Sequence, residues 1–416
     1  MKKNLTKFAA LLLSAVLLLC TVSCAAPVKA NELSGGYTRN GQEEAAMSED
    51  FAAVMADFSL RLFQGTLTED GDNDLISPLS AMLCLALVAN GADGETLRQI
   101  EQGIGMDIDT LNESLYAYTA LLSDIEDCKM QTANSIWFRD GESLTVEEQF
   151  LQTNADWYGA QVYQAPFDNS TVKDINNWVK KHTDGMIDSI IKEIDPLTVM
   201  YLINALVFDA KWQTEYEKDD IRDRTFYNAD GSRTTVDMMY SEESTYFQGD
   251  GFTGFAKNYK GGAYSFVGLL PEETSDVYEL AASLDGKAWT ELWSSRMLVS
   301  VDVGIPEFTY DAGTDLKEVL SAMGMTDMFS SAAADFSKLG QSSWGNIYCS
   351  AIQQKTLIDV SRHGTKAAAV TWATMDCKSA APLETYCVIL DRPFIYAIVD
   401  NATGLPLFLG VVSHLG

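Results

Sequence analysis

The 416-residue sequence contains few side chains that could act as a general base for catalysis. Its three histidines are His182, His363 and His414, and no Gly-x-Ser-x-Gly motif accompanies them. A Ser-His-Asp hydrolase needs a histidine base beside an exposed nucleophilic serine, so this class has little to be built from. The sequence also lacks His-Glu-x-x-His, a Walker phosphate loop and any cluster of metal ligands. We therefore expect no catalytic site, no metal and no cofactor.

One glycine-rich stretch, GDGFTG at residues 249–254, matches the Gly-x-Gly-x-x-Gly pattern of dinucleotide-binding loops. In such a site the pyrophosphate binds at the N-terminus of a helix. The residues that follow, FAKNYKGGAYSF, predict a strand and a turn instead. The pattern is therefore not interpreted as a nucleotide site.

The elements that would position functional groups change in character along the chain. Apolar residues at helical spacing predict helices within residues 49–67, 77–104, 146–160 and 172–187, with a strand at 131–139. From residue 199 most segments are rich in Val, Ile, Phe and Tyr, and several are continuously apolar, as in strands covered on both faces. One further helix is predicted at residues 315–325. Helices followed by several sheets predict an α+β fold.

The segment GTKAAAVTWATMDCKSAAP, residues 364–382, does not fit this pattern. If it is a strand, one face is small or apolar throughout: Thr365, Ala367, Ala369, Thr371, Ala373 and Met375. The opposite face carries Lys366, Trp372 and Asp376. About 24 residues separate two predicted flanking strands, and a connection of that length is usually functional. The segment could therefore be an exposed loop or a strand inserted into a sheet.

The N-terminus reads as an export signal. Three lysines and the apolar run FAALLLSAVLLLC predict that residues 1–23 are a signal peptide, too short for a comfortable membrane span. Cleavage before Cys24 would leave a lipid-modified cysteine of bacterial type, and cleavage after Ala26 or Ala30 is the alternative. Residues 24–49 are small, polar and unpatterned, which suits a flexible tether. No later linker or repeat divides residues 50–416, so we expect one domain.

The composition is strongly acidic. The formal net charge is −30, and it becomes −33 without the three lysines that precede Cys24. Nucleic acid is therefore an unsuitable partner, whereas a cationic protein would be attracted. The odd number of cysteines beyond Cys24, without a Cys-x-x-Cys motif, does not indicate a disulfide framework.

The order and spacing of several segments resemble the serpin family of protease inhibitors from about residue 50 to residue 416. The segments are ISPLSAMLCLALVANGADGETLRQI, LINALVFDAKW, TVDMM, IPEFTYDAGTDLKEVLSAMGMTDMF, GTKAAAVT and DRPFIYAIVDNATGLPLFLGVVS. The resemblance implies a serpin fold with three β-sheets, including a large central one, about nine helices and an exposed reactive-centre loop. It also implies that the loop begins with a small-residue hinge, comprising Gly364, Thr365, Lys366, Ala367, Ala368, Ala369, Val370 and Thr371.

Serpins inhibit proteases as suicide substrates, and the resemblance implies the same mechanism here. A protease attacks the loop and forms an acyl-enzyme, after which the cut loop inserts into the central sheet and traps the enzyme as a covalent complex. Family spacing places the scissile bond at Lys378-Ser379, and the lysine predicts a trypsin-like target protease. We expect the inhibitor to be a monomer. Met375 or Cys377 would instead suit an elastase-like or chymotrypsin-like enzyme. A papain-like cysteine protease and a non-inhibitory binding protein of the same fold stay open as alternatives.

The sequence departs from the family at the hinge. The residue two before Gly364 is usually Glu and is Arg362 here, while its usual Lys partner corresponds to Glu307. Because both charges are exchanged, we predict an Arg362–Glu307 ion pair of reversed polarity at the top of the central sheet.

A second departure concerns the polar cluster that lies beneath the opening of the sheet in the family. Ser77, Ser80 and Asn204 match it, but Gln354 replaces the usual His. Glutamine is both donor and acceptor, so the cluster can still be satisfied. Trp212 matches a family Trp near the insertion point.

Overall fold

The computed structural model describes residues 26–42, 44–68, 72–122, 128–140, 144–194, 198, 200–343, 345–365 and 386–416. These ranges contain nine α-helices and three large sheets, in agreement with the expected α+β fold. The helices are α2 (Phe51–Thr66), α3 (Pro78–Ala89), α4 (Gly94–Ile104), α5 (Ile108–Leu121), α6 (Glu148–Tyr158), α7 (Asn169–His182), α8 (Val277–Ser283), α9 (Gly286–Ser294) and α10 (Lys317–Ala322). The sequence pattern alone had not indicated α5, α8 or α9.

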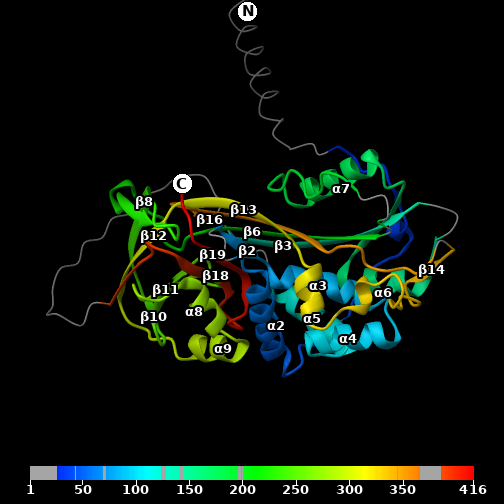
Figure 1. Cartoon of the computed structure of the whole chain (residues 1–416), viewed down its shortest axis with the longest axis horizontal. Coiled ribbons are helices and arrows are strands. Elements are labelled where there is room, and N and C mark those ends of the chain that lie inside the picture. The colour runs from blue at the N-terminus through cyan, green and yellow to red at the C-terminus, as the bar shows by residue number, and fades with distance from the viewer. Residues whose placement is uncertain are drawn as a thin grey trace, which may run out of the picture.

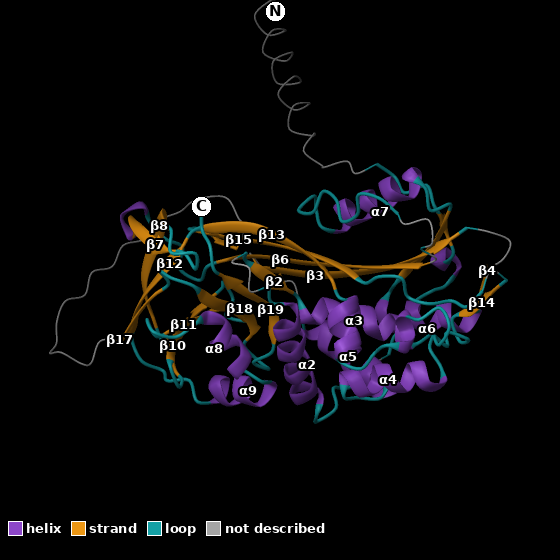
Figure 2. Cartoon of the chain, in the orientation of Figure 1, coloured by secondary structure: helices purple, strands orange, loops and turns teal. Residues whose placement is uncertain are grey.

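The central sheet has seven strands and runs along most of the molecule (Figure 1). In spatial order they are β1 (Asn31–Glu32), β5 (Gln161–Ala165), β3 (Cys128–Arg139), β6 (Met200–Lys211), β16 (Gly364–Thr365), β15 (Gln353–Ser361) and β13 (Phe308–Asp315). Helix α7 lies over one face, while α3, α5 and α6 lie on the other (Figure 2).

Two further sheets complete the fold, together with a two-stranded ribbon of β14 (Gly340–Ser342) and β4 (Leu144–Val146). The six-stranded sheet contains β2 (Asp74–Ile76), β19 (Pro406–Val412), β18 (Phe394–Asp400), β11 (Tyr264–Pro271), β10 (Phe252–Asn258) and β9 (Thr245–Gln248). The four-stranded sheet contains β17 (Tyr386–Ile389), β12 (Val301–Pro306), β8 (Arg233–Glu243) and β7 (Ile221–Tyr227). Every residue of β11, β18 and β19 is buried, as their continuous apolar sequences predict.

Helix α3 anchors the helical layer beneath the central sheet. All twelve of its residues are buried, so it is hydrophobic on every side. Ser77 caps its N-terminus by accepting a hydrogen bond from the Ser80 backbone N–H, and Pro78 occupies the first turn, where its missing N–H costs nothing. The helix therefore begins at a fixed point directly below β6, with which it is in contact.

Helix α7 covers the opposite face of the sheet through a separate apolar cluster. Ile175, Trp178 and Val179 of the helix are buried against Tyr201 and Ile203 of β6 and neighbouring side chains of β3 and β5. The outer face of the central sheet is thus covered at this end.

The expectation of a free tether over residues 24–49 does not hold for the part that the structure describes. Strand β1 pairs antiparallel with β5, and Ser34 Oγ accepts a hydrogen bond of 2.9 Å from the Val162 N–H. The Lys29 N–H also donates to Asp174 on α7 at 3.1 Å. Strand β5 would otherwise be an edge with unpaired backbone groups, and β1 satisfies them without needing an apolar sequence pattern.

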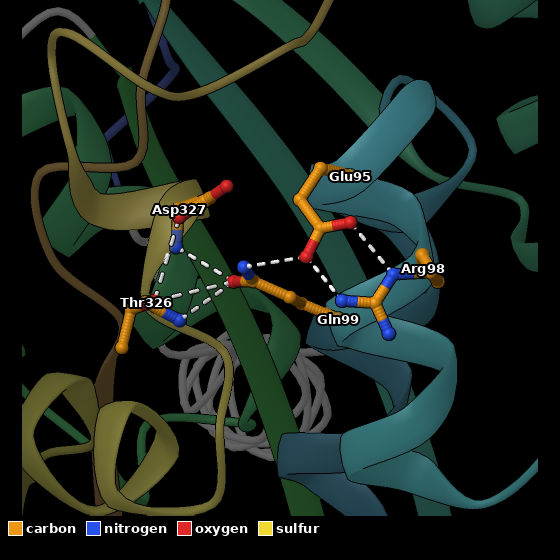
Figure 3. Close-up of polar contacts among 5 residues, drawn as sticks. All are labelled: Glu95, Arg98, Gln99, Thr326 and Asp327. Atoms are coloured by element: carbon orange, nitrogen blue, oxygen red, sulfur yellow. Dashed lines mark hydrogen bonds and ion pairs between the residues drawn. The ribbon is translucent and has the colours of Figure 1, made fainter.

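A polar contact joins α4 to the chain that follows α10 (Figure 3). The Gln99 side-chain oxygen accepts hydrogen bonds from the backbone N–H groups of Thr326 (3.1 Å) and Asp327 (2.9 Å), at the start of the 3-10 helix Asp327–Phe329. Glu95 accepts hydrogen bonds from Gln99 and Arg98.

None of the helices in the described ranges is long and apolar enough to cross a membrane.

Candidate functional site

The first two residues of the predicted hinge already form a strand inside the central sheet. Gly364 and Thr365 pair antiparallel with Ser361 and Val360 of β15 on one side, and with β6 on the other. Further along, Leu202 of β6 bridges Ile352 directly, with no strand between them. The sheet is therefore open where the hinge enters it and closed below.

Glycine is required at the entry point. Gly364 has φ +142°, which L-residues rarely adopt, and a Cβ there would lie 2.1 Å from the Ala210 carbonyl oxygen. The chain can therefore turn from β15 into the narrow space beside β6 only with a glycine at this position.

Thr365 is held beneath the entry point by an aromatic pair. Its side chain is buried, and Oγ1 is hydrogen-bonded to the Tyr259 hydroxyl at 2.8 Å. Tyr259 stacks on Trp212 with ring centroids 4.6 Å apart, and Trp212 Nε1 donates to the Ser361 carbonyl at 2.8 Å. Trp212 therefore both stacks on Tyr259 and donates a hydrogen bond to the turn between β15 and β16.

The predicted contact between Arg362 and Glu307 is present. Arg362 donates from Nε to Oε1 at 2.9 Å and from its terminal nitrogen to Oε2 at 2.8 Å, while its backbone N–H also donates to Oε1 at 2.8 Å. Partial burial opposes the charged form of Glu307, but the hydrogen bonds from Arg362 outweigh it and lower the pKa of the carboxyl. This geometry is a bidentate pair, which fixes direction as well as distance.

A second contact, a hydrogen bond between the side chains of His363 and Glu215, was not anticipated from the sequence. His363 Nδ1 lies 2.9 Å from Glu215 Oε2, and the Tyr216 N–H donates to the Arg362 carbonyl at 3.0 Å. The loop after β6 is thus attached to the two-residue turn that starts the hinge. Nothing in the local sequence marks Glu215 as a partner, because the contact depends on how the two loops meet.

A buried lysine beneath Trp212 was also missed. Lys257 of β10 has a side chain only 3% exposed, and its ammonium lies 2.7 Å from Glu243 Oε1 and 4.4 Å from the centre of the Tyr216 ring. Burial lowers the pKa of Lys257, and Glu243 partly opposes that effect. A lysine in a strand is usually exposed, so its sequence position gave no signal.

The predicted polar cluster lies at the closed part of the sheet. The Ser77 N–H donates to Gln354 Oε1 at 2.9 Å, and Gln354 Nε2 donates back to the Ser77 carbonyl at 2.8 Å. The Ser80 hydroxyl donates to Asn204 Oδ1, and Asn204 Nδ2 donates to Asn134 Oδ1 at 2.6 Å. Gln354 therefore satisfies the cluster, and Asn134 of β3 is a member that the sequence did not reveal.

The remaining predicted site residues fall outside the described ranges. They are the reactive bond Lys378-Ser379, the lipidation candidate Cys24, and the later hinge residues Lys366, Ala367, Ala368, Ala369, Val370 and Thr371. Within the part of the chain that is described, no group of three or more His, Cys, Asp or Glu side chains gathers where it could hold a metal ion.

The α+β fold has three large sheets, and the central one holds the two-residue strand β16 between β6 and β15. The family model for serpins, described as serine protease inhibitor, matches residues 53–415. Human glia-derived nexin is 32% identical over 82% of this chain and 87% of its own length. The chain therefore belongs to the serpin family.

Two solved structures of the thermophilic serpin tengpin, one in the native state and one in the latent state, can be compared with the fold of this chain. Both are 44% identical in sequence to this chain. The native state superposes with a TM-score of 0.90 over 93% of this chain and all of tengpin, and the latent state with 0.79 over 89% and 99%. The fold described here is thus more similar to the native tengpin structure than to the latent one.

Proposed function

We propose that this protein inhibits trypsin-like serine proteases as a suicide substrate, by cleavage of its own loop followed by loop insertion. The strongest support for this proposal is the position of β16. The strand already lies between β6 and β15, and the side chain of its residue Thr365 is buried. Residues that continue this strand after cleavage would add backbone hydrogen bonds on both sides.

The inward face of the loop is compatible with insertion. Thr365 points toward the core with its neighbours Ala210 and Val360, so Ala367, Ala369, Thr371 and Ala373 would follow it onto the same face. These side chains are small enough to pass into a packed interior and carry no charge that would have to be desolvated. A non-inhibitory binding protein has no need of such a face.

Inhibition would depend on a race between insertion and hydrolysis. The protease forms its acyl-enzyme with the carbonyl of Lys378, and the new N-terminus at Ser379 departs. Insertion would then carry the acyl-enzyme away from the cleavage position before water completes the reaction. Lysine before the scissile bond suits a protease with an acidic specificity pocket. The serpin remains a substrate, not a catalyst, throughout.

The proposed place of action is outside the cytoplasm. Residues 1–23 have the basic end and apolar run of a signal peptide, and lipid attachment at Cys24 would hold the protein at a cell surface. A monomer with one reactive loop would form a one-to-one covalent complex with its protease.

The test is incubation of the purified protein with trypsin, pancreatic elastase and papain, followed by denaturing gels and mass analysis. We expect a covalent complex with trypsin and a released peptide that begins at Ser379. A complex with elastase or papain and a different peptide would transfer the proposal to those target classes. Cleavage by all three enzymes without any complex would refute inhibition and favour the binding protein.

A further inference from the structure

A cavity of about 780 Å³ lies near the described residues that flank the reactive loop on both sides. Glu215 lines the cavity and is hydrogen-bonded to His363, in the turn before β16. Glu243 also lines it and pairs with Val301 of β12, which in turn pairs with Tyr386, the first described residue after the loop. A protease that holds the loop would therefore come close to this cavity.

The cavity is acidic. Its lining includes the carboxylates of Glu215, Asp220, Glu242 and Glu243, whereas Lys257 is the one cation among the described residues that line it. The Lys257 ammonium lies 2.7 Å from Glu243 Oε1, so the charges of this pair compensate each other. The other carboxylates have no cation in the lining, and a cleft lined by charges of one sign concentrates ligands of the opposite sign. A cationic group is therefore the chemistry that the cavity would bind.

The floor of the cavity is fixed by buried polar contacts. The side chain of Lys257 is 3% exposed, and the Ser241 hydroxyl donates a hydrogen bond of 2.7 Å to the carboxylate oxygen of Glu243 that Lys257 also contacts. The Ser300 hydroxyl donates to Glu242, which joins β8 to the segment before β12. A site that is ordered before binding loses less conformational entropy when its partner arrives.

The rim of the cavity also offers an apolar surface. Leu298 lines the cavity and is 79% exposed. One exposed leucine needs no explanation by itself, but here it lies at the edge of an acidic cavity. Lysine and arginine side chains combine an apolar stem with a charged head, so the stem would pack on Leu298 while the head reaches the carboxylates. This combination favours a basic side chain over an inorganic cation.

We propose that the cavity is a docking site for an arginine or lysine side chain on the surface of the target protease, occupied while that protease holds the loop. This inference rests on the proposed function, because it adds a second contact between the inhibitor and its protease. Charges at the rim of an interface act mainly on the rate of association and on its salt dependence. The site would therefore select, among proteases that accept the same scissile bond, those with a cationic surface beside the active site.

The experiment measures binding to trypsin whose catalytic serine is replaced by alanine, which can hold the loop without cutting it. A cationic and an anionic isoform are compared, because they share a specificity pocket and differ in surface charge. We expect Glu242→Arg to weaken binding of the cationic isoform by about 10-fold and Leu298→Ser by about 3-fold. Neither change should weaken binding of the anionic isoform, and high salt should shrink the effect of Glu242→Arg.

A matched variant separates the local contact from the net charge of the chain. Glu113→Arg changes the net charge as much as Glu242→Arg does, but Glu113 is exposed on α5, beneath the central sheet and away from β8 and β12 (Figure 2). We expect Glu113→Arg to weaken binding of the cationic isoform by less than about 2-fold. Glu242 and Leu298 are both exposed, so all three variants should unfold in urea at the wild-type midpoint.

The outcomes separate this inference from the proposed function. If active trypsin forms no covalent complex with the wild-type protein, the proposed inhibition fails, whereas the binding data still test the docking site. If Glu242→Arg weakens binding of the cationic isoform no more than Glu113→Arg does, or if Leu298→Ser binds it as tightly as wild type, the docking site is refuted while inhibition stands.

Discussion

At the scale of single residues, the turn that precedes Gly364 is held by a pair of charges that is exchanged relative to the family pattern. Arg362 and Glu307 form a bidentate pair, and Asp237 lies 3.6 Å from the same guanidinium. The side chains are 36% and 21% exposed, so the pair is partly shielded from water. We infer that the geometry of the pair matters for the starting position of the loop, since the backbone N–H of Arg362 is bound by the same carboxylate.

Reversing one charge should weaken this arrangement. Arg362→Glu would place three carboxylates together, and we expect a loss of about 1–2 kcal/mol in the free energy of unfolding. Adding Glu307→Arg should restore part of the loss but not the hydrogen bond to the backbone. Arg98→Glu, which breaks an exposed pair within α4, serves as the control and should cost less than about 0.5 kcal/mol. Equal losses for Arg98→Glu and Arg362→Glu in urea unfolding would contradict this account.

The same pair predicts a pH dependence. The pKa of Glu307 is lowered in the folded protein, so the unfolded state binds the proton more readily and the stabilisation is fully present above the ordinary glutamate pKa of about 4.3. It is lost as the pH falls through the lower folded value. The stability difference between wild type and Glu307→Gln should therefore be constant from about pH 6 to pH 5 and shrink below about pH 4. A difference that stays constant down to pH 3 would show that Glu307 does not titrate in this way.

At the scale of elements, the short strand β16 is the main structural support for loop insertion. It lies beside two long strands, and the polar cluster of Ser77, Asn204 and Gln354 lies where those strands meet without it. Extension of β16 would separate β6 from β15 and replace their direct bridge, Leu202 to Ile352, by an inserted strand. The fully hydrogen-bonded cluster thus opposes opening until the loop supplies new partners.

A charge on the inward face of β16 should block insertion. Thr365 is 3% exposed, so Thr365→Arg would bury an unpaired guanidinium next to Tyr259. We expect this variant to be cut by its target protease with little or no covalent complex. Lys366→Arg should behave as wild type, because residue 366 would face the outer side of an inserted strand. The measurement is the fraction of protease in complex on a denaturing gel. Complex formation by Thr365→Arg at the wild-type level would contradict the insertion argument.

Elements with a strong periodic signal could be predicted from the sequence, and those positioned by tertiary contacts could not. Helices α2, α3 and α7 follow from apolar spacing, whereas β1 forms because the edge of β5 is available. The Arg362–Glu307 pair was predictable because both charges change together against a known pattern. Lys257 and Asn134 were not, because burial of a polar side chain depends on partners from strands distant in sequence.

At the scale of the whole molecule, one hydrophobic core extends from Phe51 to Leu415 and joins all three large sheets. Below β16, the described residues of β6 and β15 are joined by the bridge between Leu202 and Ile352, so an inserted strand would add hydrogen bonds to both. The intact protein would therefore not be in its most stable arrangement. The strong negative charge of the chain would favour encounter with a cationic protease at low ionic strength.

The most direct test of loop insertion is the stability of the protein before and after cleavage at Lys378-Ser379. Intact and cleaved samples, with both fragments retained, are unfolded in guanidinium chloride under the same conditions. Insertion of the loop as a full strand predicts that the cleaved protein unfolds at a clearly higher denaturant concentration than the intact one. A cleaved protein that unfolds at the same or a lower denaturant concentration would contradict loop insertion, because the cut loop would then have gained no place in the sheet.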